Sequence, residues 1–201
     1  MNFQETEYID EDFSGGDYAH AEIVNCRFVN CSFRFANFGE AVSRGCVFEG
    51  CDLSNAKLNS SRHSNSAFLN CQLGNANLFG ATFEGCKLVG SSFAGADMTA
   101  TKIQGGDWSF TSLRAQELAS LDLHGVWFVE ADLAECDLAG SDLRDADLSR
   151  AVLWNADLTK ADLRGARLDG VDLSMVKLKD ARIDIAQAII IAESHGARVD
   201  T

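Results

Sequence analysis

Seven cysteines and four histidines are the residues of this chain whose chemistry could be redox-active, metal-binding or catalytic. Cys26 and Cys31 are separated by four residues, as are Cys46 and Cys51, and thiolates at short spacing are common zinc ligands. No glycine-rich phosphate loop and no Ser/His/Asp or Cys/His arrangement stands out from the rest of the sequence. The histidines show no ligand spacing; they are His20, His63, His124 and His195.

The cysteines share one position in a five-residue rhythm, and this rhythm argues against a metal site. Each cysteine lies two residues before a large apolar residue, in a position that Ala or Ser fills elsewhere. A small buried thiol is an ordinary occupant of such a position. Cys26 and Cys46 should stack within disulfide distance, but a cytoplasmic chain keeps them reduced. We therefore expect a protein that is not an enzyme and that needs no metal or cofactor.

Large apolar residues recur at every fifth position from Phe3 to Ile183 without a slip. These 37 central positions hold 18 Leu, 10 Phe, three Ile, two Tyr, one Met and one Trp, and only Ser43 and His63 are polar. The residue two before each centre is nearly always small, and Gly or Asn often follows two residues after it. A period of five fits neither a helix nor a strand, so the inward residues share one core only if the chain turns a corner in every unit. The sequence therefore predicts a solenoid.

The repeat, written A-(D/N)-L-x-x, is plainest in residues 156–160 and 161–165. It resembles the pentapeptide-repeat family over residues 1–183. The resemblance implies an all-β fold, a right-handed quadrilateral β-helix with four units per coil. Stacked strands lie about 4.8 Å apart, so the chain would form about nine coils and a rod of about 43 Å. The centres are rich in Phe up to Phe93 and mostly Leu afterwards, which predicts two halves with different core packing.

Four units per coil place residues twenty apart directly above one another, in columns. Ser43 and His63, the two polar centres, then lie in one column one coil apart. We expect His63 to be satisfied by Ser43 or by backbone, because an isolated histidine has neither a nucleophile nor an acid to work with.

After Ile183 the five-residue pattern stops, and residues 184–201 form a separate C-terminal segment that begins with a short helix. Asp184 can cap the first turn, Gln187 can complete a capping box and Gly196 can end the helix. One interpretation is a simple cap on the last coil. We favour a cap that also forms a homodimer interface, because the apolar surface is wider than a cap needs. The expected interface residues are Ile185, Ala188, Ile189, Ile190 and Ala192.

The formal net charge is −13, from 17 Lys+Arg and 30 Asp+Glu. We therefore expect no direct binding to nucleic-acid phosphates, and a basic partner instead. The longest apolar run, residues 188–192, is far shorter than the roughly 18 residues of a membrane helix. The N-terminus lacks the cationic, apolar and small-residue zones of a secretory signal. These features predict a cytoplasmic protein that makes no membrane contact.

The negative charge is concentrated in residues 117–172, where it forms predicted columns. At a coil spacing near 5 Å, each like-charged neighbour pair costs about 0.8 kcal/mol in water before salt screening. Two interpretations stay open: the Asp before each centre bonds the backbone of its turn, for which Asn would serve equally, or the aligned charge binds a partner. One column is Asp97, Glu117, Asp137 and Asp157, and another is Asp122, Asp142 and Asp162. The full candidate surface is Asp97, Glu117, Asp122, Asp132, Asp137, Asp142, Asp147, Asp157, Asp162 and Asp172.

Within the pentapeptide-repeat family, these columns and the helix after Ile183 are similar to MfpA-type and Qnr-type proteins. Those proteins bind DNA gyrase and protect it from quinolones, and the MfpA-type C-terminus ends in a dimerising helix. The resemblance implies a DNA mimic that modulates DNA gyrase or a related type II topoisomerase. Duplex DNA carries about one charge per 1.7 Å, and a charge of −13 on this rod is about half that density. Qnr-type loops find no room in this unbroken register, so coil faces or termini would make the contact.

The alternative is a non-catalytic scaffold whose partner binds an apolar face. One column just after the centre holds Ile9, Val29, Leu69, Val89 and Val129. The β-propensity of a solvated strand explains this column equally well. Further apolar side chains predicted to point outward are Phe35, Phe79, Phe110, Trp154 and Met175.

Overall fold

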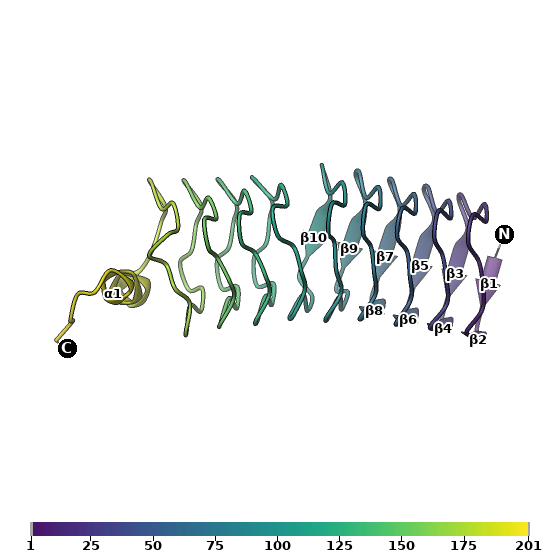
Figure 1. Ribbon diagram of the computed structural model, residues 1–201, viewed down its shortest axis with the longest axis horizontal. Coiled ribbons are helices and arrows are strands. Elements are labelled where there is room, and N and C mark those ends of the chain that lie inside the picture. The colour runs from purple at the N-terminus through teal and green to yellow at the C-terminus, as the bar shows by residue number, and fades with distance from the viewer. Residues whose placement is uncertain (1, 201) are drawn as a thin grey trace.

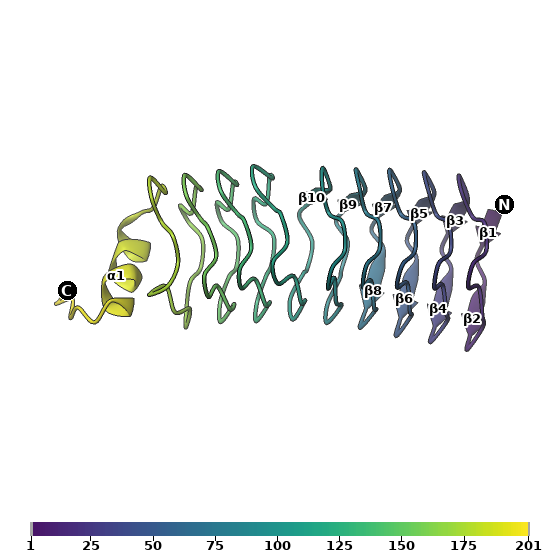
Figure 2. The same cartoon turned by 45° about the horizontal axis from the view of Figure 1, so that its top comes forward.

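The computed structural model describes residues 2–200 as a rod of stacked coils that ends in one helix at its C-terminal end (Figures 1 and 2). Each five-residue unit ends at a corner because its last residue adopts a left-handed backbone conformation. Asn25 has a φ of 52° and Gly45 a φ of 61°, and the positive sign recurs at five-residue steps along the rod. Gly and Asn reach this conformation at low cost, which explains why they are frequent at the corners.

Ten three-residue strands build the first part of the rod and pair in parallel with a register of twenty residues. One six-stranded sheet consists, in order, of β1 (Asn2–Gln4), β3 (Glu22–Val24), β5 (Val42–Arg44), β7 (Arg62–Ser64), β9 (Thr82–Glu84) and β10 (Lys102–Gln104). The four-stranded sheet consists of β2 (Glu7–Ile9), β4 (Arg27–Val29), β6 (Val47–Glu49) and β8 (Ala67–Leu69). The all-β solenoid and its columns are therefore confirmed.

The number of coils built of regular strands differs from the prediction. The stack from β1 to β10 spans about five turns, fewer than the nine or so predicted. Beyond Gln104 the coils continue through single paired residues at the same spacing, as far as Asp162 opposite Arg182. In these units a backbone hydrogen bond closes the corner, as from Ala156 N–H to the Leu153 carbonyl at 2.9 Å. The tighter corner leaves too few extended residues for a regular strand.

The core of the rod contains two side chains from each unit, the large central one and the small one two residues earlier. Phe28, Phe48 and Phe68 stack with ring centroids 4.9 and 4.7 Å apart, which is the spacing of paired strands. Leucines such as Leu138 replace the stacked rings in the second half. All seven cysteines are buried and reduced. Burial raises the pKa of the Cys136 thiol to about 12, so this thiol stays protonated and unreactive.

Helix α1 (Ile185–Ser194) closes the C-terminal end. Asp184 Oδ1 accepts the N–H groups of Ala186 and Gln187 at 3.0 and 3.3 Å. Gln187 Oε1 accepts the N–H of Asp184 at 2.7 Å, which completes the predicted capping box. Gly196, with a φ of 83°, follows the helix as predicted.

Helix α1 is attached to the rod through polar and apolar contacts; at its N-cap, Asp184 Oδ2 accepts the N–H of Gly165 at 2.9 Å. The buried Gln187 donates from Nε2 to the carbonyl of Ala166 at 2.9 Å. Ile190 and Ile191 pack against the hydrophobic core of the coils. The helix therefore caps the last coil, as both interpretations of the sequence expected.

The hydrogen-bond ladder between coils opens next to β10. In the neighbouring coils N–H groups donate to carbonyls nineteen residues on, as from Phe93 to Ser112 at 2.9 Å and from Leu118 to Asp137 at 2.8 Å. No backbone hydrogen bond joins residues 95–105 to residues 114–124, all of which the structure describes. The coils rejoin where Trp127 donates to the carbonyl of Gly106 at 3.1 Å. We call this gap the wedge; Figures 1 and 2 both show wider separation of the coils after β10.

The wedge coincides with a change in the small inward position. This position holds only Ala, Cys or Ser from Ala21 to Ala96 and again from Ala131 to Ala166. Gln116 and Leu121 occupy it on the C-terminal wall of the wedge, and their larger side chains hold the coils apart. The six intervening units hold Thr101, Gly106, Thr111, Gln116, Leu121 and Val126 there.

Candidate protein-binding surface

Two predicted columns of carboxylates are formed in the second half of the rod. The Glu117 column consists of Glu117, Asp137 and Asp157 in successive coils, and the Asp122 column consists of Asp122, Asp142 and Asp162. Each column ends in a base, because Lys177 follows Asp157 and Arg182 follows Asp162. These columns occupy two adjacent sides of the rod, while Asp132, Asp147 and Asp172 lie on the other two sides.

Asp97 does not belong to the Glu117 column, which corrects the predicted run of four. Asp97 pairs with Asn77 on its N-terminal side, but the wedge separates it from Glu117. The cause is Gln116, whose side chain enters the space between the two coils and donates from Nε2 to the Phe93 carbonyl at 3.0 Å. The column therefore contains three carboxylates.

The carboxylate before each centre bonds the backbone of its own turn. Asp137 Oδ1 accepts the N–H of Ala139 at 2.9 Å, and nine of the ten candidate residues, all except Glu117, make this bond. Asn37 and Asn77 make the same bond with their side-chain oxygens. Hydrogen bonds from Thr159 lower the pKa of Asp157, so its charge persists at neutral pH. The turn therefore explains the shape of the residue but not its charge.

The Asp122 column is largely neutralised by arginines of the same face. Arg144 binds Asp142 through two nitrogens, with Nε 2.8 Å from Oδ1. Asp162 accepts Nε and Nη2 of Arg164 at 2.8 and 2.7 Å and also contacts Arg182 at 3.2 Å. These contacts, that of Arg164 first, lower the pKa of Asp162 to about 2. This pairing was not predicted from the sequence, although acid and arginine are two residues apart and both point outward.

The Glu117 column is more open. Within residues 2–200, no Lys, Arg or His nitrogen lies within 4.0 Å of the carboxylates of Glu117 or Asp137. Asp157 contacts Lys177 Nζ at 3.2 Å, and both side chains remain partly exposed. This side of the rod therefore presents carboxylates that a basic partner can reach.

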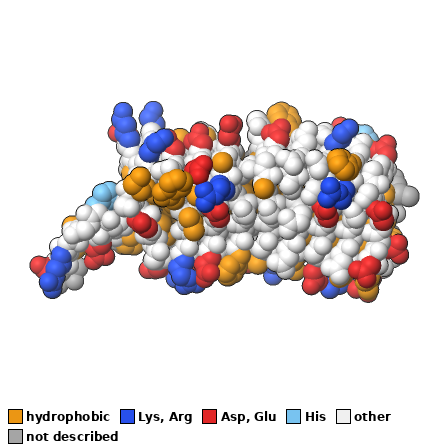
Figure 3. Space-filling view, viewed as in Figure 1, with side chains coloured by type: hydrophobic (Ala, Val, Ile, Leu, Met, Phe, Trp, Pro, Cys, Tyr) orange, Lys and Arg blue, Asp and Glu red, His pale blue; other side chains and the backbone are white. Residues whose placement is uncertain are grey.

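The remaining candidate carboxylates are mixed. Asp132 contacts Arg114 at 3.2 Å and Asp147 contacts Arg167 at 3.1 Å. Among the described residues, no Lys, Arg or His nitrogen lies within 4.0 Å of the Asp172 carboxylate. Asp172 also forms no backbone bridge with Val152 in the preceding coil. Figure 3 shows Lys and Arg side chains beside Asp and Glu side chains along the rod. These positions do not form a continuous acidic face.

The apolar face of α1 divides between the rod and solvent. Ile185 is 81% exposed and Ala188 is also exposed, while Ile189 and Ala192 are half-buried. Ile190 is also half-buried and packs against the core. The outward apolar surface is centred on Ile185.

The predicted apolar column begins on the four-stranded sheet with Ile9, Val29 and Leu69 and continues beyond it to Val89 and Val129. Ile9 pairs with Val29, and Glu49 lies between Val29 and Leu69. Ile9 is 54% exposed and Val89 is also exposed, while Val29, Leu69 and Val129 are half-buried. The predicted outward side chains are all about half-exposed or more: Phe35, Phe79, Phe110, Trp154 and Met175.

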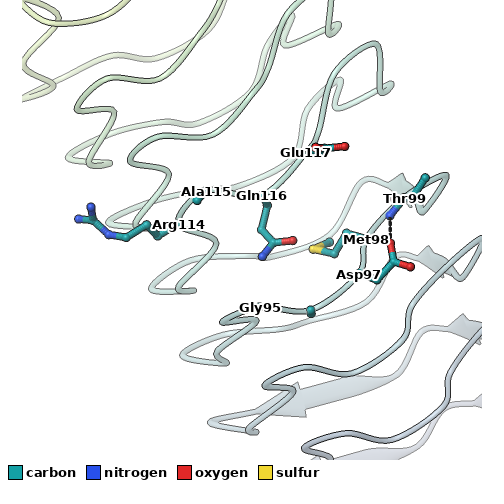
Figure 4. Close-up of a pocket in the computed structure, with 9 residues that line it drawn as sticks. Gly95, Asp97, Met98, Thr99, Arg114, Ala115, Gln116 and Glu117 are labelled. Atoms are coloured by element: carbon teal, nitrogen blue, oxygen red, sulfur yellow. Dashed lines mark hydrogen bonds between the residues drawn. The ribbon is translucent and has the colours of Figure 1, made fainter.

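The wedge was not predicted from the sequence. It holds a cavity of about 330 Å³ lined by residues 95–99 and 114–117, and one of about 520 Å³ lined by residues 100–104 and 120–122. Figure 4 shows the first of these, with Gln116 pointing between the two coils toward Met98. The signal in the sequence was the run of inward residues other than Ala, Cys or Ser from Thr101 to Val126, which includes Gln116 and Leu121.

Two features of the described residues concern metals and membranes. In residues 2–200 no group of three or more His, Cys, Asp or Glu side chains is placed to hold a metal ion. Helix α1 falls short of the length and apolar character needed to cross a bilayer, and no other helix occurs in this range.

Comparison with known proteins agrees with the coil geometry. Family models match residues 21–97 as a pentapeptide repeat region, and residues 117–155 and 146–183 as pentapeptide repeats. No curated protein sequence matches the chain. The fold is similar to trypsin-treated QnrB1, a plasmid-mediated fluoroquinolone resistance protein, with a TM-score of 0.87, 23% identity and 100% coverage of both chains. Full-length QnrB1 matches with a TM-score of 0.86 and 22% identity over 98% of this chain and 100% of its own. Because the repeat matches cover most of the coils and the register of twenty residues runs through them, the chain belongs to the pentapeptide-repeat family.

Proposed function

We propose that this protein binds DNA gyrase, or a related type II topoisomerase, by occupying the basic surface on which the enzyme holds DNA. It then modulates the enzyme and protects it from fluoroquinolones. The likeness of the whole fold to QnrB1, described as a fluoroquinolone resistance protein, supports this role. The action requires binding and no catalysis. A cytoplasmic location, without membrane or direct nucleic-acid contact, follows from the proposal.

The open Glu117 column is the observation that carries the proposal. Its three carboxylates lie on one side of the rod, one per coil, and two of them have no cationic neighbour among the described residues. Coils about 4.8 Å apart place one charge in the length over which duplex DNA carries about three. The column is therefore a sparser row of negative charge than DNA. Its fit to the basic surface of the enzyme depends on the alignment of its charges.

Helix α1 supports a homodimer as the binding unit. Ile185 is the most exposed large apolar side chain, and it lies on the helix that closes the rod. Pairing of two such ends would remove Ile185 from water and join two rods end to end. The second half of each rod, with its Glu117 column, would then flank the centre of the dimer.

The test is a charge-neutral variant of the Glu117 column, Glu117→Gln/Asp137→Asn/Asp157→Asn. Asn keeps the turn hydrogen bond, as Asn37 and Asn77 show, so the coils should stay folded by circular dichroism. Binding to immobilised gyrase should weaken at least about tenfold, and more at low salt than at physiological salt. The matched control removes three charges from the other sides with Asp132→Asn/Asp147→Asn/Asp172→Asn.

Equal loss of affinity in both variants would mean that net charge, and not the Glu117 column, attracts the enzyme. Unchanged affinity in the variant of the Glu117 column would rule out DNA mimicry. The alternative function, a scaffold that binds through the column of Ile9, Val29 and Leu69, predicts binding that is insensitive to salt. Leu69→Ser would then weaken binding, whereas the charge variants would not.

A further inference from the structure

Strand β10 is the last strand of the six-stranded sheet, and its outer edge faces the wedge. The coil of residues 114–124 faces this edge but makes no backbone hydrogen bond to β10. On the N-terminal wall the N–H groups of Met98, Ala100, Ile103 and Gly105 have no backbone acceptor. On the other wall the same holds for the N–H groups of Glu117 and Asp122. Two unpaired edges therefore face each other.

An unpaired sheet edge is a template for another extended chain. Here the chain would find donors and acceptors on both sides, since each wall is a coil that lacks its neighbour. The cavities of about 330 and 520 Å³ lie along two adjacent sides of the rod and share the corner at residues 99–100. Cavities of this order accommodate small ligands and short peptide segments.

We propose that the wedge binds an extended, basic peptide segment of a partner protein, which pairs with β10 and with the facing coil as an added strand. The walls span two repeat units on each side, so the segment has about ten residues. Backbone pairing supplies the affinity, and the side chains along the wedge determine which sequences fit.

The side chains that line the wedge define the chemistry of the segment. Gln116 and Leu121 already fill the inner part of the gap, so residues of the segment that face inward must be small. Asp97 and Glu117 flank the outer part, and no Lys, Arg or His nitrogen of residues 2–200 lies within 4.0 Å of their carboxylates. A Lys or Arg of the segment can bind between them. Because Lys102 lines the second cavity, we expect small residues facing inward and a basic residue in the first cavity, where Asp97 and Glu117 flank the segment.

This inference does not rest on the proposed gyrase contact. It requires backbone pairing inside the wedge, whereas the gyrase contact requires the Glu117 column, of which only Glu117 lies on the wedge wall. Either can fail without the other, because Asp137 and Asp157 lie one and two coils away from the wedge wall.

The experiment selects binders from a phage-displayed library of random ten-residue peptides against the full chain. Selected peptides are synthesised in plain form and with N-methyl groups on alternate backbone nitrogens. We expect the selected sequences to combine small inward residues with a basic residue that binds between Asp97 and Glu117. N-methylation keeps the charge but removes the donors, and it should weaken binding at least about tenfold. Equal binding of both forms, or selection of peptides without this pattern, would overturn the proposal.

Two variants locate the site. Gln116→Ser/Leu121→Ala restores small inward residues, so the coils should close, the Ile103 amide should become protected from hydrogen exchange, and peptide binding should be lost. Asp97→Asn/Glu117→Gln leaves the wedge open and should weaken basic peptides several-fold, whereas the control Asp137→Asn, one coil away, should not. If the Gln116→Ser/Leu121→Ala variant does not fold, the comparison of plain and N-methylated peptides on the natural chain tests the proposal by itself.

Hydrogen exchange of the natural chain provides an independent check. We expect the amides of Ile103 and Gly105 to exchange fast in the free protein and to slow when a selected peptide is added. Protection of Ile103 without peptide, independent of concentration, would show a closed ladder and defeat the proposal. Protection that rises with protein concentration would identify a second copy of this chain as the occupant and would also overturn it.

Discussion

The hydroxyl of Ser43 lies 2.7 Å from Nδ1 of His63, directly opposite it in the six-stranded sheet. The other ring nitrogen, Nε2, lies 2.9 Å from the hydroxyl of Ser61. Ser61 donates its proton to the Leu58 carbonyl at 2.6 Å, so it accepts from Nε2–H, and Nδ1 accepts the proton of Ser43. The imidazole is neutral and satisfied, and desolvation lowers the pKa of His63 to about 3. The predicted structural role is confirmed.

We expect His63 to make the fold less stable as the pH falls. The unfolded chain binds a proton at the ordinary histidine pKa of 6.5, whereas the folded chain does not until about pH 3. The free energy of unfolding should therefore fall by up to about 1.4 kcal/mol per pH unit in this window. In His63→Phe, which continues the ring stack with Phe83, the loss between pH 7 and pH 5 should be about 2 kcal/mol smaller in urea titrations. Identical pH profiles in the two proteins would contradict a neutral, buried imidazole.

Two adjacent glycines should respond differently to alanine. A Cβ on Gly106 would lie 2.3 Å from the Cys86 carbonyl oxygen, whereas one on Gly105 would have no atom within 4 Å. Both have positive φ, so Gly105→Ala should cost about 1 kcal/mol. Gly106→Ala must also move backbone and should cost about 3 kcal/mol or more, measured by urea denaturation. Equal losses would mean that the coils give way easily where they rejoin.

Removing the arginines of the Asp122 column should expose its charge. Arg144→Gln/Arg164→Gln releases Asp142 and Asp162 from their closest cations, while the exposed position of both arginines leaves the coils intact. If gyrase binds this side of the rod, affinity should rise, and should rise most at low salt. The control Arg34→Gln frees Asp52 in the first half of the rod and should have little effect. A fall in affinity would show that these arginines themselves contact the enzyme.

Ile185 should control the oligomeric state. Ile185→Asp places a charge on an exposed side chain, so the coils should fold normally while a dimer separates into 21.7 kDa monomers in sedimentation experiments. Ile190→Asp is the contrasting variant, since it buries a charge against the core and should loosen α1 from the rod. A natural chain that is already monomeric at micromolar concentration would rule out the interface.

Much of this structure was predictable because one rule repeats. The spacing of five and the coil of twenty determine which residues face inward and which share a column, as Ser43 and His63 show. The capping box of Asp184 and Gln187 was equally predictable, because it depends on residues three apart. These relations need only local geometry.

The electrostatics of the surface were less predictable. Whether Asp142 stays open or pairs with Arg144 depends on how a long side chain bends back, which a column diagram does not contain. The same difference separates the Glu117 column from the Asp122 column, although both read as rows of acid. The packing of Ile190 was not predictable for a related reason, since a helix wheel does not show how the helix is rotated on the last coil.

The wedge shows how a small irregularity alters a regular stack. Gln116 and Leu121 occupy two of the 37 inward pairs, and two enlarged side chains there are enough to open the ladder on two sides of the rod. The change in these inward residues was visible in the sequence. Its effect was not, because it depends on how much the surrounding coils can yield.

The twenty-residue register has a consequence for how such chains can change in length. Insertion or loss of one five-residue unit would rotate every later unit by a quarter turn and so move the Glu117 column to a different side from the coils before it. Insertion or loss of four units at once would lengthen or shorten the rod and leave each side in place. Duplications that keep a binding side intact are therefore restricted to whole coils, and shorter ones redistribute charge around the rod in a single step.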